Sequence, residues 1–163
     1  MENHTPEDTN SDNRMRVRQI EHGTVIDHIE AGQALNVLRI LCIDEYTKTV
    51  VSFVMNTPSS GGPKDIVKME DRELKSDEVD KLSLISPNAV INIIRDYRVV
   101  EKHKVRLPDR IEGFLKCRNV NCITNANEPA QARFVVEKKG TMPVLRCMYC
   151  DSMMSGNLTD NLV

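Results

Sequence analysis

The sequence predicts an α+β protein, and two observations carry this prediction. Between residues 15 and 100, alternating apolar and polar stretches are interspersed with two stretches in which apolar residues recur every three or four positions. From residue 117 onward, four cysteines stand in two close pairs among short apolar stretches. We therefore expect a sheet with two helices, followed by a small β-rich part that is organised by its cysteines.

The elements of the first part can be assigned in chain order. Residues 1–14 are almost entirely polar, which predicts a disordered tail. MRVRQI and TVIDHI both alternate, which predicts a first strand that is interrupted at Gly23. The next stretch predicts an amphipathic helix over residues 31–41, because its apolar positions are spaced by three and four: Ala31, Ala34, Leu35, Leu38 and Leu41.

Two strands, a helix and a last strand follow. TVVSFVMN is rich in β-branched residues and ends in the loop TPSSGGP, and KDIVKMED alternates again. SDEVDKLSLISP predicts a helix that Ser76 caps, with acidic residues in its first turn and Pro87 after its end. AVINIIRDYRVV predicts the last strand, bulged near Asp96.

The order strand, helix, strand, strand, helix, strand is that of a ferredoxin-like sheet with its helices on one face. We expect one domain over residues 15–104 and a second over 105–163, because charges and Pro108 interrupt the apolar pattern between them. The isolated Cys42 lies in an apolar stretch, and we interpret it as a small core residue.

Composition limits the classes of function. The 163 residues carry 22 basic and 24 acidic side chains, a net charge of −2 that attracts neither nucleic acid nor an anionic membrane. The first residues lack the features of a signal peptide, and no apolar run is long enough to cross a membrane, so we expect a cytoplasmic protein. In a reducing compartment, five cysteines favour metal binding over disulfides.

The cysteine spacing predicts one structural zinc site formed by Cys117, Cys122, Cys147 and Cys150. CRNVNC and CMYC are turns in which two thiols can converge, and two short strands around Lys139 and Gly140 would bring the turns together. Four thiolates fill the tetrahedral coordination of Zn²⁺ and leave no position for a catalytic water. Disulfides and a redox or iron–sulfur role are the less favoured alternatives.

A candidate anion site follows from the predicted topology. The chain holds none of the common nucleophile, metalloprotease or phosphate-loop motifs. In a ferredoxin-like sheet, however, Asp27, Lys68 and Lys102 can converge on a common surface. A carboxylate beside two ammonium groups suits a nucleotide, because the carboxylate can accept sugar hydroxyls while the ammonium groups bind phosphate.

Five segments taken together resemble the regulatory chain of aspartate carbamoyltransferase: EHGTVIDHI, GGPKDIVKMED, NAVINIIRDYRVVEK, CRNVNC and CMYC. The resemblance spans residues 17–150. It implies a non-catalytic subunit of de novo pyrimidine biosynthesis, with an N-terminal allosteric domain that pairs in a regulatory homodimer. It also implies that nucleotides of the CTP and ATP class are the effectors and that the zinc domain holds the catalytic chain.

The resemblance further implies roles for individual residues. Asp27 would bind the ribose, His28 would lie near the phosphates, Lys68 would reach base and ribose, and Lys102 would serve ribose and phosphate. The walls of the nucleotide site would come from Val17, Arg18, Gln19, Ile20, Val25, Lys64, Ile66, Asn92, Ile94, Tyr97 and Val99.

Two positions depart from the family pattern. Glu101 stands where a small residue is expected, and a carboxylate beside a triphosphate is unfavourable unless it points away. Arg18 stands where relatives can carry an acidic residue, so it adds positive charge.

The sequence is also compatible with two other functions. A stand-alone zinc ribbon could bind nucleic acid or another protein, although this chain lacks a series of aromatic residues for stacking and is slightly acidic. A thiol-dependent enzyme would require a reactive cysteine outside the metal site.

Overall fold

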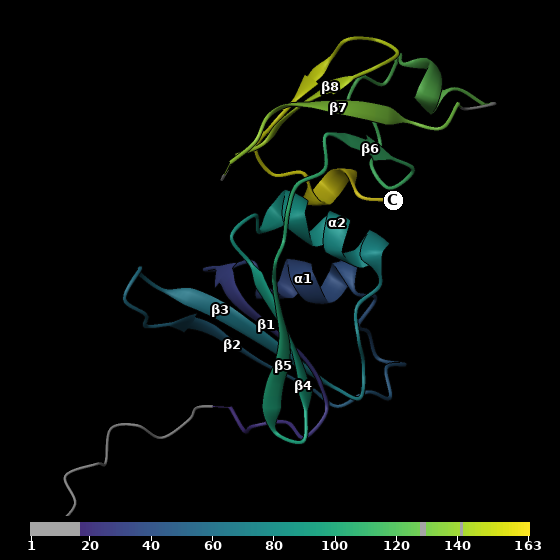
Figure 1. The fold of residues 1–163 in the computed structure, drawn as a ribbon. Coiled ribbons are helices and arrows are strands. Elements are labelled where there is room, and N and C mark those ends of the chain that lie inside the picture. The colour runs from purple at the N-terminus through teal and green to yellow at the C-terminus, as the bar shows by residue number, and fades with distance from the viewer. Residues whose placement is uncertain (1–16, 128–129, 141) are drawn as a thin grey trace, which may run out of the picture.

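The protein folds into two β-sheets, and helices lie between and beside them (Figure 1). The computed structural model describes residues 17–127, 130–140 and 142–163, so the predicted tail over residues 1–14 lies outside the described residues. Among the described residues, no helix has the length and apolar character needed to cross a membrane.

The first sheet has five antiparallel strands in the order β2-β3-β1-β4-β5. The first four strands of this order follow the predicted ferredoxin-like arrangement, and β5 is added beside β4. Their bounds are β1 Gly23–Glu30, β2 Val51–Thr57, β3 Lys64–Glu70, β4 Val90–Arg95 and β5 Arg98–Lys104.

Two helices, α1 (Ala34–Ile40) and α2 (Ser76–Ile85), cover one face of this sheet (Figure 1). Ile26 of β1, Val67 of β3 and Leu82 of α2 are fully buried in the layer between sheet and helices. Because side chains alternate along a strand, the neighbours of these strand residues point to the opposite face. That uncovered face carries the predicted nucleotide residues.

A buried carboxylate ties α1 to the sheet. Asp65 of β3 is fully buried, and its Oδ2 accepts the backbone N–H groups of Gly32 at 3.0 Å and Ala34 at 2.9 Å, where α1 begins. Its Oδ1 accepts the N–H of Asn56 at 2.8 Å. A strand residue therefore supplies the cap that the helix lacks in its own sequence.

The second sheet has the order β6-β7-β8-β9 and holds the cysteine region. Its strands are β6 Arg110–Glu112, β7 Arg133–Lys138, β8 Val144–Cys147 and β9 Met153–Met154, with two short 3₁₀ helices, η1 (Ile123–Asn125) and η2 (Thr159–Asn161). The β7–β8 hairpin confirms the predicted pair of strands around Lys139 and Gly140.

The predicted first strand is too long. Residues 17–22 are not strand, and β1 begins at Gly23 with φ +137°. A Cβ atom at this position would lie 2.0 Å from the carbonyl oxygen of Met69, so the close approach of β3 requires glycine. The alternating pattern of MRVRQI therefore does not reflect pairing in the sheet.

The predicted single last strand is also wrong, because it forms a hairpin of β4 and β5. Asp96 and Tyr97 form the connection, with φ of 52° and 63°. Two consecutive left-handed residues are typical of the two-residue turns that join antiparallel strands. The hairpin adds a fifth strand and brings Lys102 beside Asn92.

Two smaller predictions about the helices are wrong. Lys75, not Ser76, is the N-cap of α2, and its backbone N–H donates to the Glu78 carboxylate at 2.9 Å. Cys42 is exposed rather than buried. It directly follows the C-cap of α1 with φ +54°, so the end of the helix turns its side chain out of the core.

Candidate functional site

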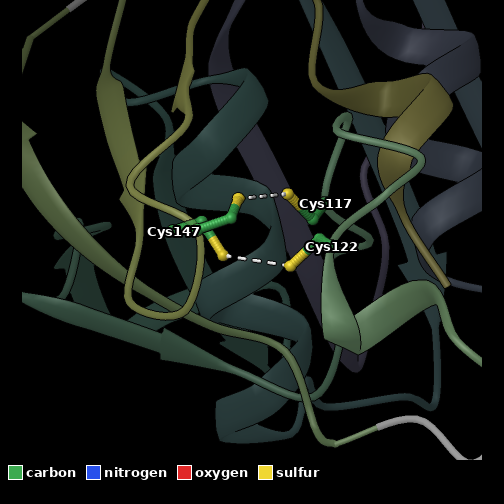
Figure 2. Close-up of side chains that lie close together, drawn as sticks. Cys117, Cys122 and Cys147 are labelled. Carbon is green, nitrogen blue, oxygen red and sulfur yellow. Dashed lines mark hydrogen bonds between the residues drawn. The ribbon is translucent and has the colours of Figure 1, made fainter.

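The four predicted cysteines converge into one cluster. Their sulfur atoms all lie within 4.8 Å of one another, with Cys117 and Cys150 3.6 Å apart and Cys122 and Cys147 3.8 Å apart. Figure 2 shows the Cys117 and Cys122 side chains on one side and the Cys147 side chain opposite them. A tetrahedron of sulfurs about 2.3 Å from Zn²⁺ has edges of about 3.8 Å, so the spacing fits this ion.

Neighbouring side chains fix the first pair of cysteines. Asn125 donates from Nδ2 to the carbonyl oxygens of Cys117 at 2.9 Å and Asn119 at 2.8 Å. Thr124 Oγ1 donates to the Cys122 sulfur at 3.2 Å. Such outer contacts hold ligands in the geometry that a metal requires.

The second pair sits in a tight turn after β8. The backbone N–H of Cys147 donates to Ser152 O at 2.9 Å, and that of Asp151 donates to Cys147 O at 3.0 Å. Burial raises the pKa of Cys147, whereas hydrogen bonding by Ser152 lowers the pKa of Cys150 to about 6. The prediction of one four-cysteine zinc site is therefore confirmed in its ligand set, and no ligand position remains open.

A pocket of about 300 Å³ lies on the uncovered face of the first sheet. Its floor includes one cross-strand row in which Lys68 pairs with Val25, Val25 with Asn92, and Asn92 with Lys102. Residues paired across neighbouring strands project to the same face, so two lysines flank an apolar and an amide side chain. The pocket is lined by Gln19, Ile20, Val25, Asp27, His28, Lys68, Val90, Asn92, Ile94, Tyr97, Val99 and Lys102.

Asp27 and His28 both face this pocket although they are consecutive in β1. The pairing of β1 with β3 shifts between Ile26 and Ile29, and His28 has φ +55°. A bulge of this kind places two adjacent side chains on one face of a strand. Because of this irregularity, the His28 imidazole faces the pocket, whereas regular strand pairing would have placed it on the opposite face of the sheet.

Asp27 is held in its charged form. Burial alone would raise its pKa, but hydrogen bonds from Lys64 Nζ at 2.7 Å and from the His28 N–H at 2.6 Å outweigh burial, so the pKa lies below its ordinary value. Burial lowers the pKa of Lys68, and the Asp27 charge partly offsets this. Lys68 Nζ donates to the carbonyl oxygens of Val17 at 3.4 Å and Arg18 at 3.0 Å.

Four of the predicted residues do not line the pocket. Lys64 forms an ion pair with the pocket residue Asp27, and Ile66 pairs with Val54 of β2. Val17 and Arg18 line a neighbouring hollow that extends to Val50, Ser52 and Phe53 around β2. Val90 was not predicted but does line the pocket. The β1–β4 pairing explains its position, because Val90 lies opposite Asp27.

Comparison with known proteins agrees with both halves of the structure. Residues 15–106 match the family described as "Aspartate carbamoyltransferase regulatory chain, allosteric domain", and residues 109–159 match "Aspartate carbamoyltransferase regulatory chain, metal binding domain".

Curated proteins named aspartate carbamoyltransferase regulatory chain are similar over nearly the whole length. The protein of Methanosarcina barkeri is 50% identical over 152 residues, which covers 91% of this chain and 96% of that protein. The protein of Methanococcoides burtonii is 52% identical over 149 residues (91% and 94%), and that of Haloarcula marismortui is 52% identical over 156 residues (95% and 98%). The chain therefore belongs to the aspartate carbamoyltransferase regulatory chain family.

Proposed function

We propose that this chain is the non-catalytic regulatory subunit of an aspartate carbamoyltransferase, acting in the cytoplasm in pyrimidine biosynthesis. It binds a nucleotide effector on the uncovered face of its first sheet and holds catalytic chains through its zinc domain. The observation that carries the proposal is the presence, in one chain, of a cation-flanked pocket and a closed four-thiolate site. The first offers a place for a regulatory anion, and the second stabilises a fold without offering a place for chemistry.

The proposed nucleotide site uses the pocket residues in distinct roles. The Asp27 carboxylate accepts ribose hydroxyls, and Lys68 and Lys102 at the two ends of the row contact base, ribose and phosphate. His28 lies beside the phosphates. Among the described residues Lys102 makes no ion pair, so its ammonium group is available to an anion.

We propose that residues 15–104 form the allosteric domain and residues 105–163 the zinc domain. Within the zinc domain, both metal-binding turns expose apolar side chains: Val120 is 80% exposed, Ile123 54%, Met148 42% and Tyr149 43%. A metal that fixes both turns also fixes these side chains. Exposed apolar residues on rigid turns suit a stable protein partner, here the catalytic chain.

A regulatory homodimer is the second proposed assembly. Val50 and Phe53, in and beside the edge strand β2, are 63% and 43% exposed. An exposed apolar edge strand is an aggregation hazard unless a partner covers it. Pairing of two copies along this edge would cover it and place the hollow near Val17 and Arg18 beside the partner copy.

Co-elution with aspartate carbamoyltransferase catalytic chains tests the function. The zinc-loaded chain should co-elute, and the chelated chain should not. CTP or ATP should then change the aspartate dependence of the reassembled enzyme, because an effector regulates only by binding one state of the assembly better than another. Failure of the zinc-loaded chain to co-elute would argue against the regulatory role and favour a stand-alone zinc module.

A further inference from the structure

Arg118 lies within the first metal-binding turn, directly after Cys117, and its side chain holds the end of the chain. Its Nε donates to Asn161 Oδ1 at 3.0 Å, its Nη1 to Ser155 O at 2.8 Å and its Nη2 to Asn157 O at 2.6 Å. The planar guanidinium offers several donors in fixed directions, which suits three acceptors in one short segment. One side chain thus joins the zinc turn to residues 155–163.

This C-terminal segment is packed against the chain that leads into the zinc turn. Lys116 N donates to Asn161 O at 2.7 Å, and Val163 N donates to Phe114 O at 3.0 Å. Leu158 is 1% exposed and belongs to the buried core. Displacing the segment would therefore expose an apolar side chain and break several backbone hydrogen bonds.

Phe114, which accepts the hydrogen bond from Val163, also contacts the first domain. Nζ of Lys81, which belongs to α2, lies over the Phe114 ring at 5.8 Å from the ring centroid. In Figure 1 the C-terminal segment (yellow) and η2 are drawn next to α2, at the boundary between the two sheets. The segment thus occupies the junction of the two parts of the chain.

We propose that Arg118 and residues 155–163 form a latch that retains the metal at the four-cysteine site. The ion can leave only when a ligand turn opens. Opening the turn of Cys117 and Cys122 requires Arg118 either to give up its three acceptors or to pull the C-terminal segment out of the core. Loss of outer contacts of this kind typically weakens metal binding about 10- to 100-fold.

A second explanation for any role of Arg118 is its charge alone. Zn²⁺ with four thiolates carries a net negative charge, which a nearby guanidinium would stabilise without any latch. Lysine separates the two explanations, because it keeps the charge but has no planar fork to reach three acceptors.

Zinc release from the full-length, zinc-loaded chain to an excess of a chromogenic chelator is the test. Arg118→Ala should release zinc about tenfold faster than the unmodified chain, and Arg118→Lys nearly as fast. Arg133→Ala, which removes another exposed arginine of this domain, should stay within about twofold of the unmodified rate. An unmodified rate for Arg118→Ala would overturn the latch, and slow release by Arg118→Lys would assign the effect to charge instead.

Truncation tests the other half of the latch. A chain that ends at Met154, which lacks all three acceptors of Arg118, should release zinc about as fast as Arg118→Ala, and combining the two changes should add little, because both open the same latch. Rates that multiply in the combined variant would mean two independent effects and would overturn the proposal.

If the truncated chain fails to bind one zinc per chain, its release rate cannot be measured, and amide hydrogen exchange tests the latch instead. In zinc-loaded Arg118→Ala, the Lys116 amide, which donates to Asn161, should exchange at least tenfold faster. Unchanged exchange would contradict the latch. These measurements need neither nucleotide nor catalytic chain, so their failure is distinguishable from failure of the regulatory function.

Discussion

Lys102 and Glu101 are adjacent in β5 but occupy opposite faces of the first sheet. Lys102 lines the pocket of the uncovered face. Glu101 lies with Val79 of α2 on the helix side, and its Oε2 is within hydrogen-bond distance of His103 Nε2, at 3.0 Å. The departure from the family pattern at residue 101 therefore places no carboxylate in the pocket.

Lys102→Ala should weaken CTP or ATP binding to the isolated chain by about tenfold or more, because a charge-assisted hydrogen bond contributes about 1.5–3 kcal/mol. Isothermal titration calorimetry measures this directly. Glu101→Gln is the matched control and should change affinity less than threefold. Equal losses in the two variants would argue against the proposed phosphate contact.

Asp27→Asn should remove an acid-sensitive part of the stability. The pKa of Asp27 is lower in the folded protein than its ordinary value of 3.8, so its ion pair stabilises the fold above that pH and is lost as pH falls through the folded pKa. The difference in unfolding free energy between the two chains should therefore be constant above about pH 5 and shrink below about pH 4. Urea titrations across this range measure it, and a difference that grows on acidification would reverse the assignment.

Asp65→Asn should destabilise the chain by about 2–3 kcal/mol, because the substitution replaces one of two acceptor oxygens by an NH₂ group. In one orientation of the amide, this group faces the N–H donors of Gly32 and Ala34, and in the other it faces the N–H of Asn56. Urea unfolding gives the free energy. Asp71→Asn, at an exposed position, serves as the control and should stay within about 0.5 kcal/mol. A similar small effect at residue 65 would mean that the cap of α1 contributes little.

Cys42→Gly should stabilise the chain by about 0.5–1 kcal/mol, because glycine adopts the left-handed conformation of this position without strain. Cys42→Ala removes the thiol but keeps the Cβ atom, so it should give no gain. Thermal unfolding of the three chains compares them. Equal gains in the glycine and alanine variants would point to the thiol rather than to the backbone.

Chelation of zinc should unfold residues 105–163 and leave the five-stranded sheet folded. Metal binding of this type is worth roughly 10–16 kcal/mol, which the small core of a domain of this size cannot replace. Hydrogen exchange should then lose protection in β7 and β8 but keep it in β1 and β3. Protection of β7 and β8 that survives metal removal would show that the second sheet folds without its ion.

Periodicity and cysteine spacing were sufficient for the architecture but not for local geometry. The order of the first four strands and two helices follows from side-chain periods, and the zinc ligands follow from two short cysteine spacings. The β4–β5 hairpin was missed because Asp96 and Tyr97 lack the glycine that usually marks such turns.

Cys42 and the bulge in β1 were missed for a related reason. Hydrophobicity predicts burial for Cys42, yet the end of α1 turns that position outward. At His28, strict alternation would point the side chain into the core, and only the observed register shift shows that it shares a face with Asp27. Backbone conformation at single residues decides both cases, and residue type specifies it weakly.

The position of the zinc ligands along the chain sets an order of maturation during synthesis. The first sheet is complete once Lys104 has been made, whereas the metal site also needs Cys150, which lies 46 residues (150 − 104) further along the chain. Domains generally fold as units from the N-terminus as they leave the ribosome. A nascent chain that has passed Lys104 but not Cys150 would therefore carry the pocket without the surface proposed to bind its partner, and it would become competent to assemble only after its last zinc ligand has been made.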